Sequence, residues 1–111
     1  MKKLAVIGFG QIGASLAGAW KPDLRILAID RDPDTRRKAR ERGLADEVSE
    51  RIEDAAGADA ALLAVPVRSV IELLPKIETP LLLDVASTKG ALVETYRATK
   101  RETPYISLHP L

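Results

Sequence analysis

Short apolar runs alternate with amphipathic segments along the whole of this 111-residue sequence. The runs at residues 4–7, 60–65 and 81–83 contain no polar residue, which is typical of strands buried on both faces of a parallel sheet. Residues 67–74 carry apolar side chains at the i, i+3, i+4 and i+7 positions that form one face of a helix. Because parallel strands joined by single helices need right-handed crossovers, the pattern predicts an α/β fold with a doubly wound, mainly parallel sheet.

Six strands are expected, separated by helices that should cover both faces of the sheet. Their predicted ranges are residues 4–7, 24–29, 45–48, 60–65, 81–83 and 104–108. The first helix should turn Ile12, Leu16 and Ala19 toward the sheet, because these residues follow the i, i+4, i+7 spacing. Asp32 followed by a proline is typical of a helix N-terminus, and the polar helix that begins there should end at Gly43.

The composition is that of one small globular domain over residues 1–111, since 46% of the residues are hydrophobic and 30% are charged. Lysines and arginines number 17 against 16 aspartates and glutamates, so the sequence gives no reason to expect nucleic acid as a partner. The basic run at residues 36–42 is interpreted as a solvated helix face with i,i+4 ion pairs. With no cysteine and one histidine, we expect no metal site. No apolar run approaches the roughly 20 residues of a membrane span, so we expect a cytoplasmic protein without a membrane partner.

The segment between the first predicted strand and the first predicted helix has the pattern G-x-G-x-x-G. Its residues, all candidates for cofactor binding, are Gly8, Phe9, Gly10, Gln11, Ile12 and Gly13. In this context the first glycine permits a tight turn, the second lets a pyrophosphate approach the backbone, and the third lets the helix pack closely on the strand. The helix N-terminus offers N–H groups to the phosphates. The pattern therefore predicts a Rossmann-type dinucleotide-binding domain, and the alternative is a tight turn that serves packing alone.

An acidic residue, Asp30, follows the second predicted strand at the offset where a carboxylate meets the adenosine ribose. A carboxylate there accepts hydrogen bonds from the ribose hydroxyls and repels a 2′-phosphate, which favours NAD over NADP. Asp32 is expected to cap the next helix, which leaves Asp30 free for the ribose. Arg31 weakens the preference, because a guanidinium beside the ribose can tolerate a phosphate, and it can also stack on adenine or remain solvated.

Chemically competent side chains follow the last three predicted strands, whose carboxyl ends border the ligand cleft of such a fold. They are Val65, Pro66 and Arg68 at the carboxyl end of the fourth strand, Ser87, Thr88 and Lys89 after the fifth, and His109 after the sixth. Arg68 is expected on the adenosine side, with a surface arginine as the alternative. A neutral imidazole is suited to take up a proton near pH 7, so His109 is a candidate base. Ser87 and Thr88 are also residue types that cap helices.

The stretch D-V-A-S-T-K at residues 84–89 and the pair His109-Pro110 resemble the nucleotide-binding domain of prephenate and arogenate dehydrogenases. The resemblance covers essentially the whole chain. It implies NAD-dependent oxidative decarboxylation of prephenate or arogenate in tyrosine biosynthesis. In such an oxidoreductase His109 would be the base, and Ser87 would bind the substrate hydroxyl and the histidine. Lys89 would lie near the nicotinamide or the substrate carboxylate, or serve a structural role.

The family pattern continues past the position of Leu111 with a helical domain that completes the substrate pocket and forms the dimer interface. By this resemblance we expect residues 1–111 to lack that domain, and we expect the chain alone to bind NAD without measurable turnover. Two alternatives remain from the sequence. One is an NAD-binding regulatory or sensing module without turnover, and the other is a Rossmann reductase of the β-hydroxyacid or imino-acid type.

Overall fold

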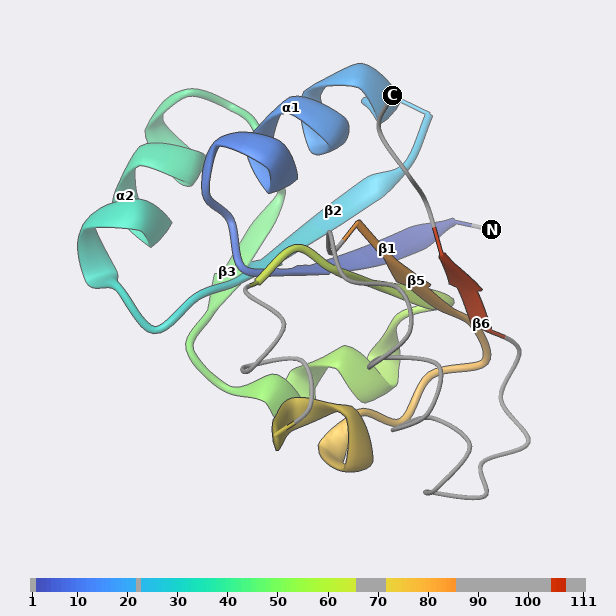
Figure 1. The fold of residues 1–111 in the computed structure, drawn as a ribbon. Coiled ribbons are helices and arrows are strands. Elements are labelled where there is room, and N and C mark those ends of the chain that lie inside the picture. The colour runs from blue at the N-terminus through green and yellow to red at the C-terminus, as the bar shows by residue number, and fades with distance from the viewer. Residues whose placement is uncertain (1, 22, 66–71, 86–104, 108–111) are drawn as a thin grey trace.

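A six-stranded parallel sheet forms the centre of the molecule (Figure 1). The structure is a computed structural model that describes residues 2–21, 23–65, 72–85 and 105–107. The strands are β1 (Lys3–Ile7), β2 (Arg25–Ile29), β3 (Glu47–Ser49), β4 (Ala60–Leu63), β5 (Leu82–Asp84) and β6 (Tyr105–Ser107). Their spatial order is β3-β2-β1-β4-β5-β6, and every neighbouring pair is parallel. The order reverses between β1 and β4, where ligands bind in doubly wound folds. The predicted Rossmann-type fold is confirmed.

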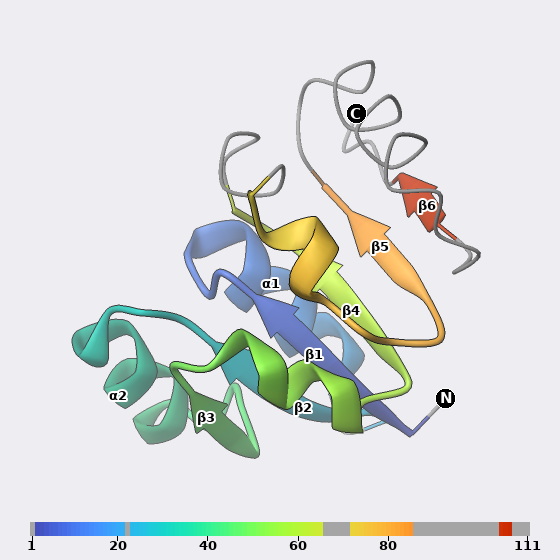
Figure 2. The ribbon, with the colours of Figure 1, turned by 90° about the horizontal axis from the view of Figure 1, so that it is seen from below.

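Helical segments cover both faces of this sheet. The helices α1 (Gln11–Trp20) and α2 (Pro33–Glu41) lie on one face, and the short 3₁₀ segments η1 (Ile52–Gly57) and η2 (Leu74–Lys76) lie on the other (Figures 1 and 2). None of the helices in the described ranges is long and apolar enough to cross a membrane.

The core has two halves because side chains alternate between the faces of each strand. In β1, Leu4 and Val6 belong to the half that includes residues of α1 and α2, whereas Ala5 and Ile7 belong to the half that includes Ala55 of η1. All four of these β1 residues are buried, with at most 2% of their surface exposed. The continuous apolar runs of the sequence are therefore the strands that need burial on both faces.

Helix α1 differs from its prediction in which residues it buries. Gly13 and Ala17 are buried, whereas Ala19 is exposed, so the prediction that Ala19 faces the sheet is wrong. Ala19 follows Ala17 by two residues, which places it about 200° around the helix axis. Small residues form the buried face because α1 packs very closely on the sheet.

Strand β3 begins at Glu47, two residues after the predicted start at residue 45. Asp46 lies just before it, and its Oδ2 accepts a hydrogen bond of 2.8 Å from the N–H of Ile26 at the start of β2. Its Oδ1 lies 3.3 Å from the Nζ of Lys21, which follows α1. These two bonds connect three elements at the amino edge of the sheet. The backbone N–H bond, followed by the ammonium of Lys21, lowers the pKa of Asp46 below its ordinary value.

The lowered pKa of Asp46 predicts a loss of stability in acid. A carboxyl whose pKa is lower in the folded state stabilises the protein above its unfolded pKa of about 3.9, and this contribution disappears as the pH falls through the folded pKa. We expect Asp46→Asn to reduce the slope of unfolding free energy against pH below about pH 4. Denaturant unfolding at a series of pH values measures that slope. Asp23→Asn, at an exposed aspartate, is the control, and equal slopes for the two variants would contradict the assignment.

Candidate functional site

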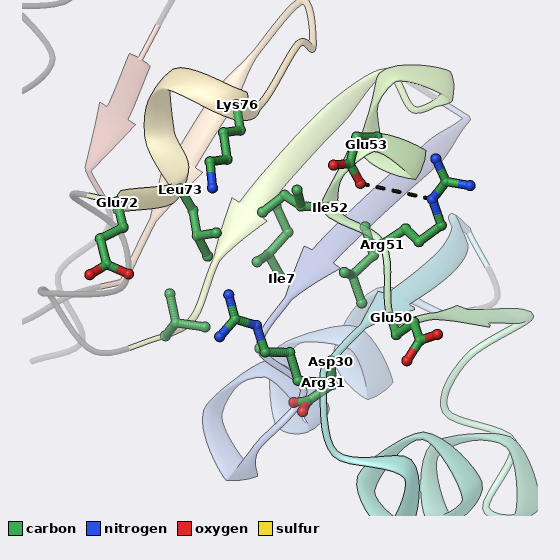
Figure 3. Close-up of a pocket in the computed structure, with 13 residues that line it drawn as sticks. Ile7, Asp30, Arg31, Glu50, Arg51, Ile52, Glu53, Glu72, Leu73 and Lys76 are labelled. Carbon is green, nitrogen blue, oxygen red and sulfur yellow. Dashed lines mark ion pairs between the residues drawn. The ribbon is translucent and has the colours of Figure 1, made fainter.

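A cleft of about 540 Å³ opens at the carboxyl edge of the sheet, where β1, β2 and β4 end. Its apolar walls come from Ile7, Ile29, Ile52, Val65 and Leu73. Figure 3 shows Ile7 and Ile52 side by side, with Leu73 extending toward them from the helical segment on the opposite wall. Charged side chains surround these apolar walls, so the cleft has an apolar interior and a polar rim, as small-molecule sites commonly do.

Two glycines of the G-x-G-x-x-G segment are required by the fold, Gly8 in the loop after β1 and Gly13 in the first turn of α1. Gly8 has a positive φ of +86°, and a Cβ on it would lie 2.3 Å from Val65 Cγ1 and 2.9 Å from the carbonyl oxygen of Ala64. A Cβ on Gly13 would lie 2.5 Å from the carbonyl oxygen of Gly8. These distances leave no room for a side chain. The predicted structural roles of Gly8 in the turn and of Gly13 in close packing are confirmed.

Gly10 is different, because nothing in the described fold requires a glycine there. Its φ of −74° is open to any residue, and a Cβ would meet no atom within 4 Å. Gly10 is also the N-cap of α1, and neither a capping side chain nor an acidic residue occupies the first turn of that helix. By contrast, Asp32 caps α2 through a bond of 3.2 Å from the N–H of Asp34. The N-terminus of α1 is therefore open to an external anion.

Asp30 lies directly after β2 and connects that strand to the glycine loop. Its Oδ2 accepts the N–H of Phe9 at 2.9 Å, and its Oδ1 accepts the N–H of Asp32 at 2.9 Å. Asp30 therefore has two protein partners, and Asp32 rather than Asp30 caps α2, as predicted. An ionised carboxylate has about four lone-pair directions, so two remain after these bonds. The protein bonds fix the carboxylate at the rim of the cleft, and it keeps the capacity to accept from a ligand.

Arg31 and Lys76 provide positive charge in the cleft. Figure 3 shows the guanidinium of Arg31 extending into the space in front of Ile7 and Leu73, while Arg51 turns outward toward Glu53. Arg51 Nε lies 3.9 Å from Glu53 Oε2, whereas no hydrogen bond or ion pair engages the Arg31 side chain within the described ranges. An exposed guanidinium beside apolar walls is suited to stack on a planar ring or to meet an anion.

Some of the remaining candidate residues lie within the described ranges and the others lie outside them. Phe9 has a buried ring, 4% exposed, and donates its N–H to Asp30, so neither group is available to a ligand in the cleft. Gln11 and Ile12 begin α1, and Val65 lines the cleft. The candidates Pro66, Arg68, Ser87, Thr88, Lys89 and His109 lie outside the described residues. Within the described ranges, no group of three or more His, Cys, Asp or Glu side chains is arranged to hold a metal ion.

Sequence reasoning missed two kinds of residue at this site. Ile52 and Leu73 line the cleft, but their apolar character is equally expected of core residues and gives no signal for a ligand. Arg36 was assigned to a solvated helix face, and that assignment is wrong. Its side chain is 20% exposed and donates to the carbonyl oxygens of Asp30 and Arg31. Its position near the N-terminus of α2 is the signal, because side chains there point back toward the preceding loop.

Comparison with known proteins gives matches along this chain. It matches the family described as "Prephenate dehydrogenase, nucleotide-binding domain" over residues 14–111. Prephenate dehydrogenase of Lactococcus lactis subsp. cremoris is 36% identical over 124 residues, which cover 100% of this chain and 34% of that protein. The chain thus spans about a third of the length of this relative.

Solved structures agree with these sequence matches. The structure of prephenate dehydrogenase from A. aeolicus, in complex with hydroxyphenyl propionate and NAD+, has a TM-score of 0.86 at 27% identity and covers 100% of this chain and 42% of that chain. Synechocystis arogenate dehydrogenase has a TM-score of 0.83 at 32% identity, covering 97% of this chain and 40% of that chain. The family match extends over residues 14–111, most of the sequence, and agrees with the observed fold, so the chain belongs to the family of prephenate dehydrogenase nucleotide-binding domains.

Proposed function

We propose that this chain is a dinucleotide-binding domain that binds NAD in the cleft at the carboxyl edge of its sheet. The observation that carries the proposal is the N-terminus of α1, where Gly10 leaves open space and no side chain caps the helix. Such a terminus fits a pyrophosphate, which accepts N–H bonds and is stabilised by the helix dipole. The NAD+ complex of the A. aeolicus relative supports the choice of ligand.

The residues that line the cleft fit the other parts of NAD. Asp30 would accept from the adenosine ribose, and the apolar walls formed by Ile29, Ile52 and Leu73 would enclose the adenine. Arg31 would stack on the base or stay at the rim. The nicotinamide ring supplies the chemistry of the bound cofactor, which is the acceptance of a hydride.

The Asp30 carboxylate should favour NAD over NADP, because it accepts from two ribose hydroxyls but repels a 2′-phosphate. Replacement by Asp30→Ala should narrow the difference in binding free energy between the two dinucleotides by roughly 1–3 kcal/mol, the range of a charge-assisted hydrogen bond. Calorimetry at fixed ionic strength measures both affinities. Glu72→Ala removes an exposed carboxylate elsewhere in the cleft and should leave the difference unchanged. An unchanged difference in a folded Asp30→Ala variant would refute the role of Asp30.

For the reaction, we propose NAD-dependent oxidative decarboxylation of prephenate or arogenate, to which this chain contributes the cofactor site. Hydride would leave the carbon bearing the ring hydroxyl as carbon dioxide departs and the ring becomes aromatic. His109 would take the hydroxyl proton, and Ser87 would hydrogen-bond the hydroxyl and the imidazole. Support comes from the sheet, in which Asp84 of β5 pairs with Ser107 of β6. The two strands that immediately precede Ser87 and His109 in the sequence therefore end side by side.

The reaction is tested by following NADH absorbance after NAD is mixed with prephenate or arogenate. The assay is run on this chain alone and after addition of the helical domain of the family. We expect NADH only after the helical domain is added, and this result supports the reaction. NADH formation by the chain alone would also support the reaction but would contradict the expectation that the pocket is shared between two domains. Bound NAD without NADH in both mixtures would overturn it and favour a sensing role.

A further inference from the structure

Arg36 stands apart from the other basic residues of α2 in its contacts. Its side chain is 20% exposed, compared with 60% for Arg37 and 54% for Lys38. Its Nη1 donates to the carbonyl oxygen of Asp30 at 2.7 Å and to that of Arg31 at 3.0 Å. One guanidinium therefore holds the backbone of both residues that follow β2.

The same guanidinium also approaches a second loop at the cleft. Its Nη2 lies 4.0 Å from Glu50 Oε2, and Glu50 comes directly after β3. Asp30, Arg31 and Glu50 all line the cleft, whereas Arg36 itself does not. Arg36 thus contacts residues that line the ribose end of the cleft but does not itself line the cleft.

The two ends of Asp30 are fixed by different elements. Its carboxylate is held by the N–H groups of Phe9 and Asp32, and its carbonyl is held by Arg36. Recognition of a ribose diol by one carboxylate depends on positions held to a fraction of an ångström. From these contacts we infer that Arg36 is a positioning residue, which sets the preference for NAD over NADP by holding Asp30 and Arg31 in place. The inference rests on the proposed binding of NAD.

If Arg36 acted only through its charge, its removal would change the preference between NAD and NADP in the opposite direction, which makes the inference testable. Loss of a cation near the ribose end would weaken NADP, which has the additional 2′-phosphate, more than NAD, so the preference for NAD would increase. Loss of positioning would weaken the diol contact and lessen the repulsion between Asp30 and the phosphate, so the preference for NAD would decrease. Lysine keeps the charge but lacks the rigid guanidinium, whose Nη1 donates to both carbonyls while its Nη2 faces Glu50.

The experiment measures the dissociation constants of NAD and NADP by calorimetry for the unmodified protein, Arg36→Met, Arg36→Lys and the control Arg37→Met. Arg37 pairs within α2 with Asp34 and Glu41. We expect the preference for NAD to fall by about 3- to 10-fold in Arg36→Met, by less in Arg36→Lys, and not at all in the control. Thermal unfolding is recorded in parallel, and Arg36→Lys decides the outcome if the methionine variant does not fold.

A preference for NAD that is unchanged or increased in a folded Arg36 variant would overturn the positioning role and leave NAD binding intact. A lower melting temperature with an unchanged preference has the same meaning, since it shows a purely structural role. Failure of the unmodified protein to bind NAD would instead overturn the proposed function, and the inference with it.

Discussion

A Gly10→Val variant is expected to keep its fold and to lose at least about 100-fold in NAD affinity, which corresponds to about 2.7 kcal/mol. The φ of −74° at this position is open to valine, and an added Cβ meets no protein atom within 4 Å. Valine is a poorer N-cap than glycine, which costs about 1 kcal/mol of stability. The space that the side chain enters is where the pyrophosphate should approach the start of α1, so the variant excludes the ligand. Calorimetry with NAD, together with thermal unfolding, measures both effects.

Gly57→Val provides the control for the Gly10 prediction. Gly57 is the last residue of η1, and a Cβ there also meets nothing within 4 Å. This variant should bind NAD as the unmodified protein does. Normal NAD affinity in a folded Gly10→Val variant would show that the glycine is not required for a ligand.

Gly8→Ala is expected to destabilise the fold itself, by about 3 kcal/mol or more. A positive φ costs a residue with a Cβ about 1–2 kcal/mol, and overpacking costs about 1–3 kcal/mol in addition. The φ is +86°, and the new Cβ would lie 2.3 Å from Val65 Cγ1 and 2.9 Å from the Ala64 carbonyl oxygen. A domain of this size is stable by about 5–15 kcal/mol, so the loss is a large part of the total. Denaturant unfolding measures it.

A second substitution separates the two causes at Gly8. Val65→Ala removes the Cγ1 atom that clashes with the new Cβ, but it changes neither the backbone conformation nor the contact with the Ala64 carbonyl. Gly8→Ala should therefore cost less stability when it is introduced into the Val65→Ala variant than when it is introduced into the unmodified protein. Full stability of Gly8→Ala would mean that the turn adopts another conformation.

The fold was predictable from sequence because its main signals are local. Residues 4–7 of β1 and all of β4 are apolar, since both faces of the sheet are buried there. Asp32 and Pro33 mark the start of α2 by side-chain and backbone chemistry within a few residues. Strand β3 was placed less accurately because it is a short edge strand with only partly buried residues. The hydrogen bond between Asp46 and Ile26 that ends the preceding loop joins residues 20 positions apart.

The candidate site was predictable only in part, because some of its residues are marked by local patterns and others reach the site only through contacts distant in sequence. The glycine pattern and Asp30 are visible because backbone geometry and charge restrict which residue types can stand there. The anchoring of Asp30 by Phe9 depends on a contact across 21 residues, and Ile52 and Leu73 reach the cleft only through the packing of η1 and of residues 72–76. No local pattern distinguishes such residues from ordinary core or surface residues.

Titration of the purified protein with NAD and NADP in parallel, by calorimetry at one salt concentration, tests the central claim most directly. An open N-terminus on α1 and an anchored carboxylate at Asp30 predict saturable binding of both dinucleotides, with NAD bound more tightly. Equal affinities would contradict the role of Asp30, and the absence of NAD binding would contradict the assignment of the cleft as a dinucleotide site.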